Sequence, residues 1–214
     1  MRHALKDTTA PGTRLYERGT HAIIVACGGA IWAFFGLQGL QGWRGWIPFA
    51  VLAPIPLLII LIILAGLYLR ARSVALPRGE SRWKRGRGGY LMIVRLEYLA
   101  IGAAIILCAL LQRTVYLLPI IAVIVGVHFF ALRSILPTVP AIVKGAILTL
   151  VGALTVALLP QRIVAGAPME HTLILWEVVP GLLSAAVLWF DGVSAALGGF
   201  RLLREAARMV ATSG

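Results

Sequence analysis

Three ionisable side chains lie inside long apolar stretches of the sequence: Glu97, His128 and Asp191. A charged group in the hydrocarbon of a membrane costs at least about 2.5 kcal/mol, so such residues are kept chiefly where they serve a function or are paired. A carboxyl group in a low-dielectric environment binds its proton more tightly, and histidine exchanges its proton near neutral pH. These residue types are therefore suited to passing protons or to binding a small polar substrate.

Long apolar helices are the elements that would position these groups. The chain has 214 residues, of which 60% are hydrophobic and 13% charged, and its mean hydropathy is +0.91. Soluble domains carry about 25% charged residues, so this composition excludes a soluble fold. A helix needs about 20 apolar residues to cross a bilayer. Six stretches approach or exceed this length, at 21–40, 46–69, 91–111, 115–136, 141–159 and 173–199.

We therefore expect an all-α fold, with a single membrane domain over 1–214 built as a bundle of six transmembrane helices. The run 57–64 is continuously apolar, whereas the strands of a transmembrane β-barrel alternate apolar and polar residues. The start of the sixth helix is the least defined, because two glutamates and a proline lie near it. Residues 170–179 form either a short interfacial segment or the first part of this helix.

The basic residues predict the orientation of this bundle. Most of the 20 Lys and Arg residues fall on one side, in the N-terminal segment, the loop at 70–90, the loop after the fourth helix (where Lys144 is counted) and the tail at 200–214. Cytoplasmic loops retain positive charge. Both termini are therefore expected in the cytoplasm (N-in, C-in), in a multi-pass protein of a bacterial-type inner membrane.

The same loop and tail are predicted to contact anionic lipid headgroups, which contribute about 1 kcal/mol for each basic residue at the surface. In the tail, apolar residues separate the arginines, a pattern that predicts an amphipathic helix along the inner membrane surface. No nucleic-acid partner is expected, because the sequence shows no soluble domain that could recognise DNA or RNA. The predicted lipid contacts are Arg82, Lys84, Arg85, Arg87, Arg201, Arg204 and Arg208.

The ionisable residues are predicted to lie at one depth. At about 1.5 Å per residue, Glu97 lies about 9 Å, His128 about 8 Å and Asp191 about 12 Å inside the cytoplasmic ends of their helices. Thr149 on the fifth helix joins this layer. Small residues share the helix faces of both carboxylates, and such residues mark helix contacts in lipid. We expect these four residues to line a cytoplasm-facing proton or substrate site.

Each group also has a purely structural explanation. Glu97 could pair with Arg95 or hydrogen-bond Tyr98, which are close to it in the sequence. Asp191 could be satisfied by Ser194 or by a group on another helix. A single histidine on an apolar helix is often a hydrogen-bonded core residue.

Metal, haem and disulfide chemistry are not predicted. His3, His21 and His171 lie outside the apolar stretches or at their rims, and no Cys-x-x-Cys or Glu-x-x-His spacing occurs. Cys27 and Cys108 are expected at different depths, so each is interpreted as a small packing residue. We therefore expect no cofactor.

The segment 118–129, which contains Gly126-Val127-His128-Phe129, resembles small uncharacterised bacterial membrane proteins with a Gly-x-His-Phe/Leu pattern on one helix. The resemblance covers about two of the six stretches and implies a membrane class without an activity. Three functions remain open from the sequence. They are a small-solute or proton-coupled carrier, a non-catalytic scaffold, accessory or sensor subunit with a protein partner or as a homo-oligomer, and a lipid-directed enzyme with Asp191 and His128 as acid and base.

Overall fold

The computed structural model describes residues 11–41, 54–72, 82–132, 139–165 and 171–213. In these ranges the chain is predominantly helical, which confirms the expected all-α bundle. The helices are α1 (Pro11–Gln38), α3 (Pro54–Arg72), α4 (Arg82–Leu110), α5 (Leu117–Leu132), α6 (Val139–Leu158) and α7 (Leu175–Ser213), with a 3-10 turn η1 at Thr114–Tyr116.

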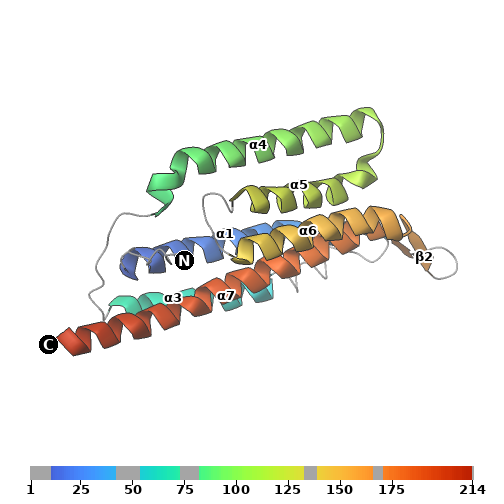
Figure 1. Cartoon of the computed structure of the whole chain (residues 1–214). Coiled ribbons are helices and arrows are strands. Elements are labelled where there is room, and N and C mark those ends of the chain that lie inside the picture. Colours follow the sequence, from blue (N-terminus) through green and yellow to red (C-terminus); the bar gives the residue numbers. More distant parts are fainter. Residues whose placement is uncertain (1–10, 42–53, 73–81, 133–138, 166–170, 214) are drawn as a thin grey trace.

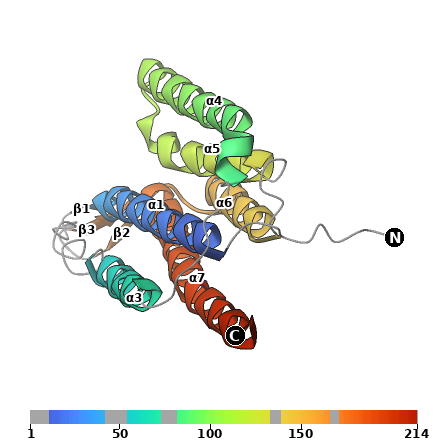
Figure 2. The same cartoon turned by 90° about the vertical axis from the view of Figure 1, so that its left-hand side faces the viewer.

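The helices pack side by side along one common direction (Figures 1 and 2). The centre of the bundle is formed by α1, α5, α6 and α7, and α1 and α7 share the most extensive contact. On one side α4 packs mainly on α5, and on the other α3 packs on α1 and α7. We call the end where α1, α4 and α6 begin and α5 and α7 end the basic end, and the opposite one the sheet end.

Five of the described helices are long and apolar enough to cross a membrane: Gly12–Gln38, Gly88–Leu110, Thr114–Leu132, Ala141–Leu158 and Leu175–Glu205. The predicted span 46–69 begins outside the described residues, and its described part is the shorter apolar helix Pro54–Leu69. Six crossings therefore stay a prediction. In the uncertain segment 170–179, residues 175–179 form the start of α7.

A short antiparallel sheet, which the sequence did not predict, lies at the sheet end. Its strands are hydrogen-bonded in the order β1 (Leu40–Gln41), β3 (His171–Leu173) and β2 (Ile163–Ala165). Leu40 pairs with Leu173, and the N–H of Ile174 donates to the carbonyl oxygen of Gly39 at 2.8 Å. The sheet thereby ties the end of α1 to the start of α7. Strands of two or three residues are too short to show an alternating pattern.

Close helix crossings occur at glycines. Between α1 and α7, a Cβ added to Gly36 would lie 2.9 Å from the Cα of Gly181. Between α5 and α6, a Cβ added to Gly145 would lie 2.8 Å from the carbonyl oxygen of Gly126. Small residues allow helix backbones to approach closely in lipid, where packing supplies the stability of the contact.

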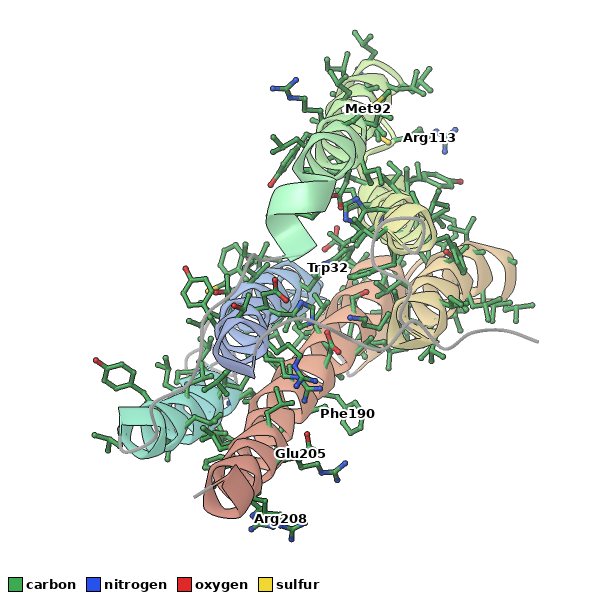
Figure 3. The ribbon with its side chains drawn as sticks, turned by 60° about the vertical axis from the view of Figure 1, so that its left-hand side comes forward. Trp32, Met92, Arg113, Phe190, Glu205 and Arg208 are labelled. Carbon is green, nitrogen blue, oxygen red and sulfur yellow. The ribbon has the colours of Figure 1, made fainter. Side chains whose placement is uncertain are left out.

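Apolar side chains fill the interior and also cover much of the outside. Trp32, Ala122 and Leu188 belong to a buried cluster that joins α1, α5 and α7. Large apolar side chains such as Met92 and Phe190 point away from the bundle (Figure 3). An apolar outer surface on helices of this length is what a bilayer would cover.

The tail differs from the separate surface helix expected for it, because residues 200–213 continue α7 without a break. The helix runs through Gly198 and Gly199, although glycine often ends a helix. At Gly199 an added Cβ would lie 2.8 Å from Leu67 of α3, and Leu202 and Leu203 are buried. Packing on the neighbouring helices therefore keeps the tail helical beyond the two glycines.

Candidate functional site

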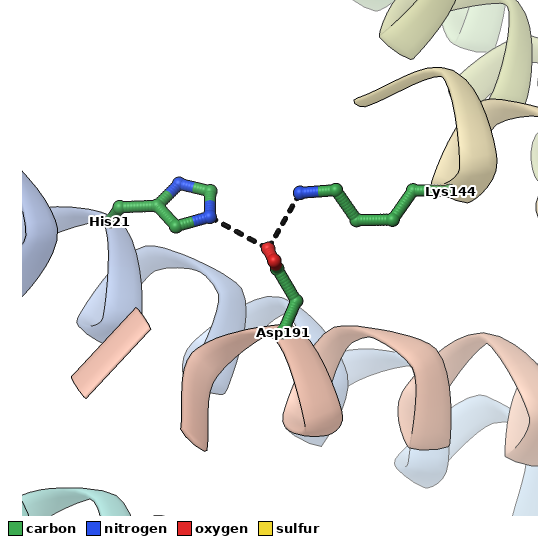
Figure 4. Close-up of polar contacts among 3 residues, drawn as sticks. All are labelled: His21, Lys144 and Asp191. Carbon is green, nitrogen blue, oxygen red and sulfur yellow. Dashed lines mark hydrogen bonds and ion pairs between the residues drawn. The ribbon is translucent and has the colours of Figure 1, made fainter. Parts of the chain in front are cut away.

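Asp191 on α7 is held by two side chains from two other helices. The Nε2 atom of His21 on α1 and the Nζ atom of Lys144 on α6 each lie 2.6 Å from the same carboxylate oxygen, Oδ2 (Figure 4). We call these three residues the Asp191 cluster. It joins α1, α6 and α7 at a single atom.

Small residues beside the cluster bring α7 close to α1, and α6 close to α5. Gly192 follows Asp191, and a Cβ there would lie 3.3 Å from the carbonyl oxygen of Ala22, which follows His21. Gly145 follows Lys144 and forms the close crossing with α5. On the other side of Asp191, Phe190 points away from the bundle (Figure 3). Because the backbones are close, the short Asp191 side chain reaches both partners.

The cluster is buried unevenly. The side chains of Lys144 and Asp191 are 11% and 16% exposed, whereas that of His21 is 35% exposed. Removing charges from water is costly and is tolerated only where the charges are paired with good geometry. Lys144 and Asp191 therefore depend on each other, and His21 is the member of the cluster that is most open to its surroundings.

Glu97 on α4 and His128 on α5 form a second pair of groups. Oε2 of Glu97 lies 3.1 Å from Nδ1 of His128, and the side chains are 17% and 11% exposed. The contact is not aligned as a hydrogen bond, and within the described residues this Nδ1 has no other hydrogen-bond partner. This contact is therefore not a hydrogen bond, and the relative position of the two side chains is less constrained than in the Asp191 cluster.

Phe129 connects the two sets of groups. Its ring meets the His128 ring edge to face, with 5.8 Å between the centroids and an interplanar angle of 83°. The same ring also contacts Lys144, whose Nζ lies 4.9 Å from the ring centre. A cation over an aromatic face is attracted by the negative potential of the ring. The Glu97–His128 pair and the Asp191 cluster are therefore neighbours separated by one aromatic side chain.

The predicted residues thus fall into two groups. Glu97 and His128 lie together, and Asp191 lies with His21 and Lys144 instead. Thr149 lies on α6 against Gly126, where its buried Oγ1 has no hydrogen-bond partner in the described part of the chain. That these residues form a proton or substrate site stays a prediction.

Sequence reasoning missed two members of the cluster. The assignment of Lys144 to a loop is wrong, because the residue lies inside α6 and is only 9% exposed. His21 was placed at the rim, whereas it contacts the buried carboxylate. One signal was available: Lys144 falls within the apolar stretch 141–159 and therefore needed a counter-ion.

The predicted lipid contacts lie at the basic end. Arg201 and Arg204 are exposed on α7, and Arg208 is near the end of that helix (Figure 3). The predicted loop 70–90 is shorter than expected, because α4 begins at Arg82. The side chains of Arg82, Lys84, Arg85 and Arg87 lie outside the part that the structure describes.

Comparison with protein-family models, with curated proteins and with solved structures found no match to this chain. The resemblance of segment 118–129 to small bacterial membrane proteins therefore stays an expectation. Among the described residues, no group of three or more His, Cys, Asp and Glu side chains is arranged to hold a metal ion.

Proposed function

We propose that this protein is a small multi-pass membrane carrier that couples solute movement to protonation, with the Asp191 cluster as its coupling site. One observation carries the proposal: a buried carboxylate oxygen is shared by a histidine and a lysine from two other helices. Ionisable groups within transmembrane segments commonly mark proton relays and substrate pathways.

Protonation of Asp191 is the coupling step of this proposal. Protonation of the carboxylate removes the charge that attracts Lys144, so the cluster would lose its strongest tie between α6 and α7. A buried ion pair is seldom needed for stability, since apolar residues of similar size often serve as well. Charges retained at such a position suit a contact that must break and re-form, and helices that separate and return are the basis of alternating access.

The Glu97–His128 pair supplies a second protonatable unit next to the first. Histidine exchanges protons near neutral pH, and Phe129 places this pair beside Lys144. A change in the charge of the Glu97–His128 pair would therefore alter the electrostatic potential at the Asp191 cluster, and the reverse also holds, because only the Phe129 ring separates them. Two adjacent protonatable units are what a proton-coupled cycle needs to load and release in sequence.

The proposed orientation places the basic end in the cytoplasm of a bacterial-type cell. Arg14 and Arg18 on α1 and the exposed arginines of α7 gather at this end. Positive charge is retained on the cytoplasmic side of a membrane, and the same residues suit contact with anionic lipid headgroups. Both ends of the described chain then lie inside, and His21 faces the cytoplasmic half of the bilayer.

The test is proton entry into vesicles. The purified protein is reconstituted into phosphatidylethanolamine–phosphatidylglycerol vesicles with a trapped pH-sensitive dye, and cationic, neutral and anionic solutes are added outside. We expect at least one solute class to drive proton entry, Asp191→Asn to abolish it and Arg162→Gln, an exposed cation outside the cluster, to preserve it.

Circular dichroism checks that the Asp191→Asn protein is folded. The double variant Asp191→Asn/Lys144→Met, which leaves no unpaired charge, should also lack the flux. Proton entry at the wild-type rate in either protein, or no entry with any solute class, would overturn the proposal.

A second candidate, an accessory or scaffold subunit, is favoured by α4. This helix packs on α5 and η1 and is the least buried of the helices that could cross a membrane, with Leu99 and Ile106 among its exposed residues. A face of this kind fits acyl chains or the transmembrane helix of a partner. If the scaffold function is correct, a partner co-purifies in fixed ratio from a mild detergent and Asp191→Asn does not disturb that complex.

A further inference from the structure

Cations outnumber carboxylates around the Asp191 cluster. Arg14 lies three and four residues before Glu17 and Arg18, and His21 lies four and three residues after them, so the four residues share one side of α1. The guanidinium of Arg18 lies against Gly198 of α7, which is two helical turns from Asp191 on the same face. With Lys144 from α6 this gives three permanent cations, Arg14, Arg18 and Lys144, against two carboxylates, Glu17 and Asp191.

Arg14 and Lys144 are partly or fully withdrawn from water, whereas Arg18 is exposed. Nε of Arg14 is buried and has no hydrogen-bond partner within the described residues. Lys144 is buried as well, and among the residues that the structure describes its carboxylate partner is Asp191. Anionic oxygens are the natural partners of buried Lys and Arg side chains.

We propose that the ligand of this site is a small anion, bound through carboxylate or phosphate oxygens, which replaces Asp191 at Lys144 when Asp191 takes up a proton. The inference rests on the proposed carrier function and names its substrate class. The anion and the proton would then be loaded together.

Charge conservation favours this coupling. Before loading, Lys144 is paired with the Asp191 carboxylate. After loading, Asp191 is neutral and the Lys144 ammonium is paired with the anion, so one proton and one negative charge have entered and the net charge of the site is unchanged. Loading either species alone would leave an unpaired charge in a low-dielectric region, which is costly.

The surroundings of Asp191 supply a route for the proton. From α1, His21 contacts Oδ2 at 2.6 Å and is the most exposed member of the cluster, so it can pass a proton from the basic end to this oxygen. From α6 the facing group is Lys144, and Phe129 of α5 lies beyond it. From α3, the aliphatic Ile60 packs against Gly192. His21 and Lys144 are therefore the titratable groups in direct reach of the carboxylate, and His21 is the more exposed of the two.

The test measures formate binding to the purified protein in neutral detergent at constant ionic strength, by calorimetry between pH 5.5 and 8. Formate is a single carboxylate that stays ionised over this range. If one proton is bound with each anion, the dissociation constant rises about tenfold for each unit of pH. Proton uptake on mixing, followed with a pH dye in weak buffer, should approach one proton for each formate.

Variants separate the roles of the two charges. Asp191→Asn mimics the protonated carboxyl group, so it should bind formate at least as tightly as the wild type at low pH, without pH dependence. Asp191→Asn/Lys144→Met should bind at least tenfold more weakly, and Arg162→Gln should bind as the wild type does. Formate should also raise the unfolding temperature of Asp191→Asn more than that of the wild type, because it restores a partner to Lys144.

A lipid phosphate offers the same anionic oxygens as a free solute. A parallel titration therefore uses phosphatidylglycerol in place of formate. The anion whose dissociation constant rises with pH identifies the source of the ligand. A flat pH profile with both anions, or loss of binding in Asp191→Asn, would overturn the anion proposal. Solute-driven proton entry that depends on Asp191 would still support a carrier, so the two proposals can fail separately.

Discussion

The Asp191–Lys144 pair gives the sharpest prediction for stability. Asp191→Asn leaves the ammonium of Lys144, whose side chain is 11% exposed, without a carboxylate. Removing one partner of a buried ion pair costs about 3–5 kcal/mol, because the other charge stays buried. Lys144→Met should cost less, about 1.5–3 kcal/mol for one hydrogen bond to a charged group, since His21 remains 2.6 Å from the same oxygen.

The double variant should be more stable than the two single losses suggest. With both charges gone, no charge is stranded, and neutral replacement of a buried pair often costs little. We therefore expect a coupling energy of at least about 2 kcal/mol in the double-mutant cycle.

The assay is reversible unfolding in mixed micelles of phospholipid and increasing dodecyl sulfate, followed by circular dichroism. Arg162→Gln is the control for loss of an exposed cation and should change the free energy of unfolding by less than about 0.5 kcal/mol. If the two single losses add to within about 0.5 kcal/mol, Lys144 and Asp191 do not stabilise each other and the reasoning is refuted.

Two further predictions use the same unfolding assay. Gly181→Ala should lower the free energy of unfolding by about 1–3 kcal/mol through overpacking, because the new Cβ would lie 2.6 Å from the Gly36 nitrogen. The control is Gly102→Ala, where a Cβ meets nothing within 4 Å, and it should be neutral or slightly stabilising. Equal losses in the two variants would contradict the close crossing. A Glu97→Gln/His128→Gln cycle should give a coupling below about 1 kcal/mol, since the 3.1 Å contact is not aligned as a hydrogen bond; a value as large as that of Asp191–Lys144 would show that the pair is tightly bonded.

The apolar stretches predicted the helices well because length and hydropathy are properties of single segments. The stretch 141–159 became α6 at Val139–Leu158, and 115–136 became α5 at Leu117–Leu132. The sheet was not predictable in this way. Its two- and three-residue strands depend on pairing between residues far apart in the sequence, such as Leu40 and Leu173.

The depth of the ionisable residues could be predicted from the sequence, but their partners on other helices could not. Depth along a helix can be estimated from sequence, so His128 and Glu97 were expected at one level, and the structure brings them to 3.1 Å. Rotation of one helix against another cannot be estimated so simply. The partners of Asp191 depend on which faces of α1 and α6 meet α7. The charge of Lys144 was counted as a loop charge that orients the bundle, whereas it is paired with Asp191 inside the bundle.

The positions of the small residues show that packing and charge in this bundle depend on each other. His21, Lys144 and Asp191 are each followed directly by a small residue: Ala22 and Gly192 lie where α1 crosses α7, and Gly145 lies where α6 crosses α5. The helix backbones approach closely only because these residues lack bulk, and an Asp side chain is too short to reach two partners across a wider gap. Conversely, without the pairing, a nearly buried lysine would favour separation of the helices. A proton on Asp191 would therefore act on the α1–α7 crossing as well as on the charge.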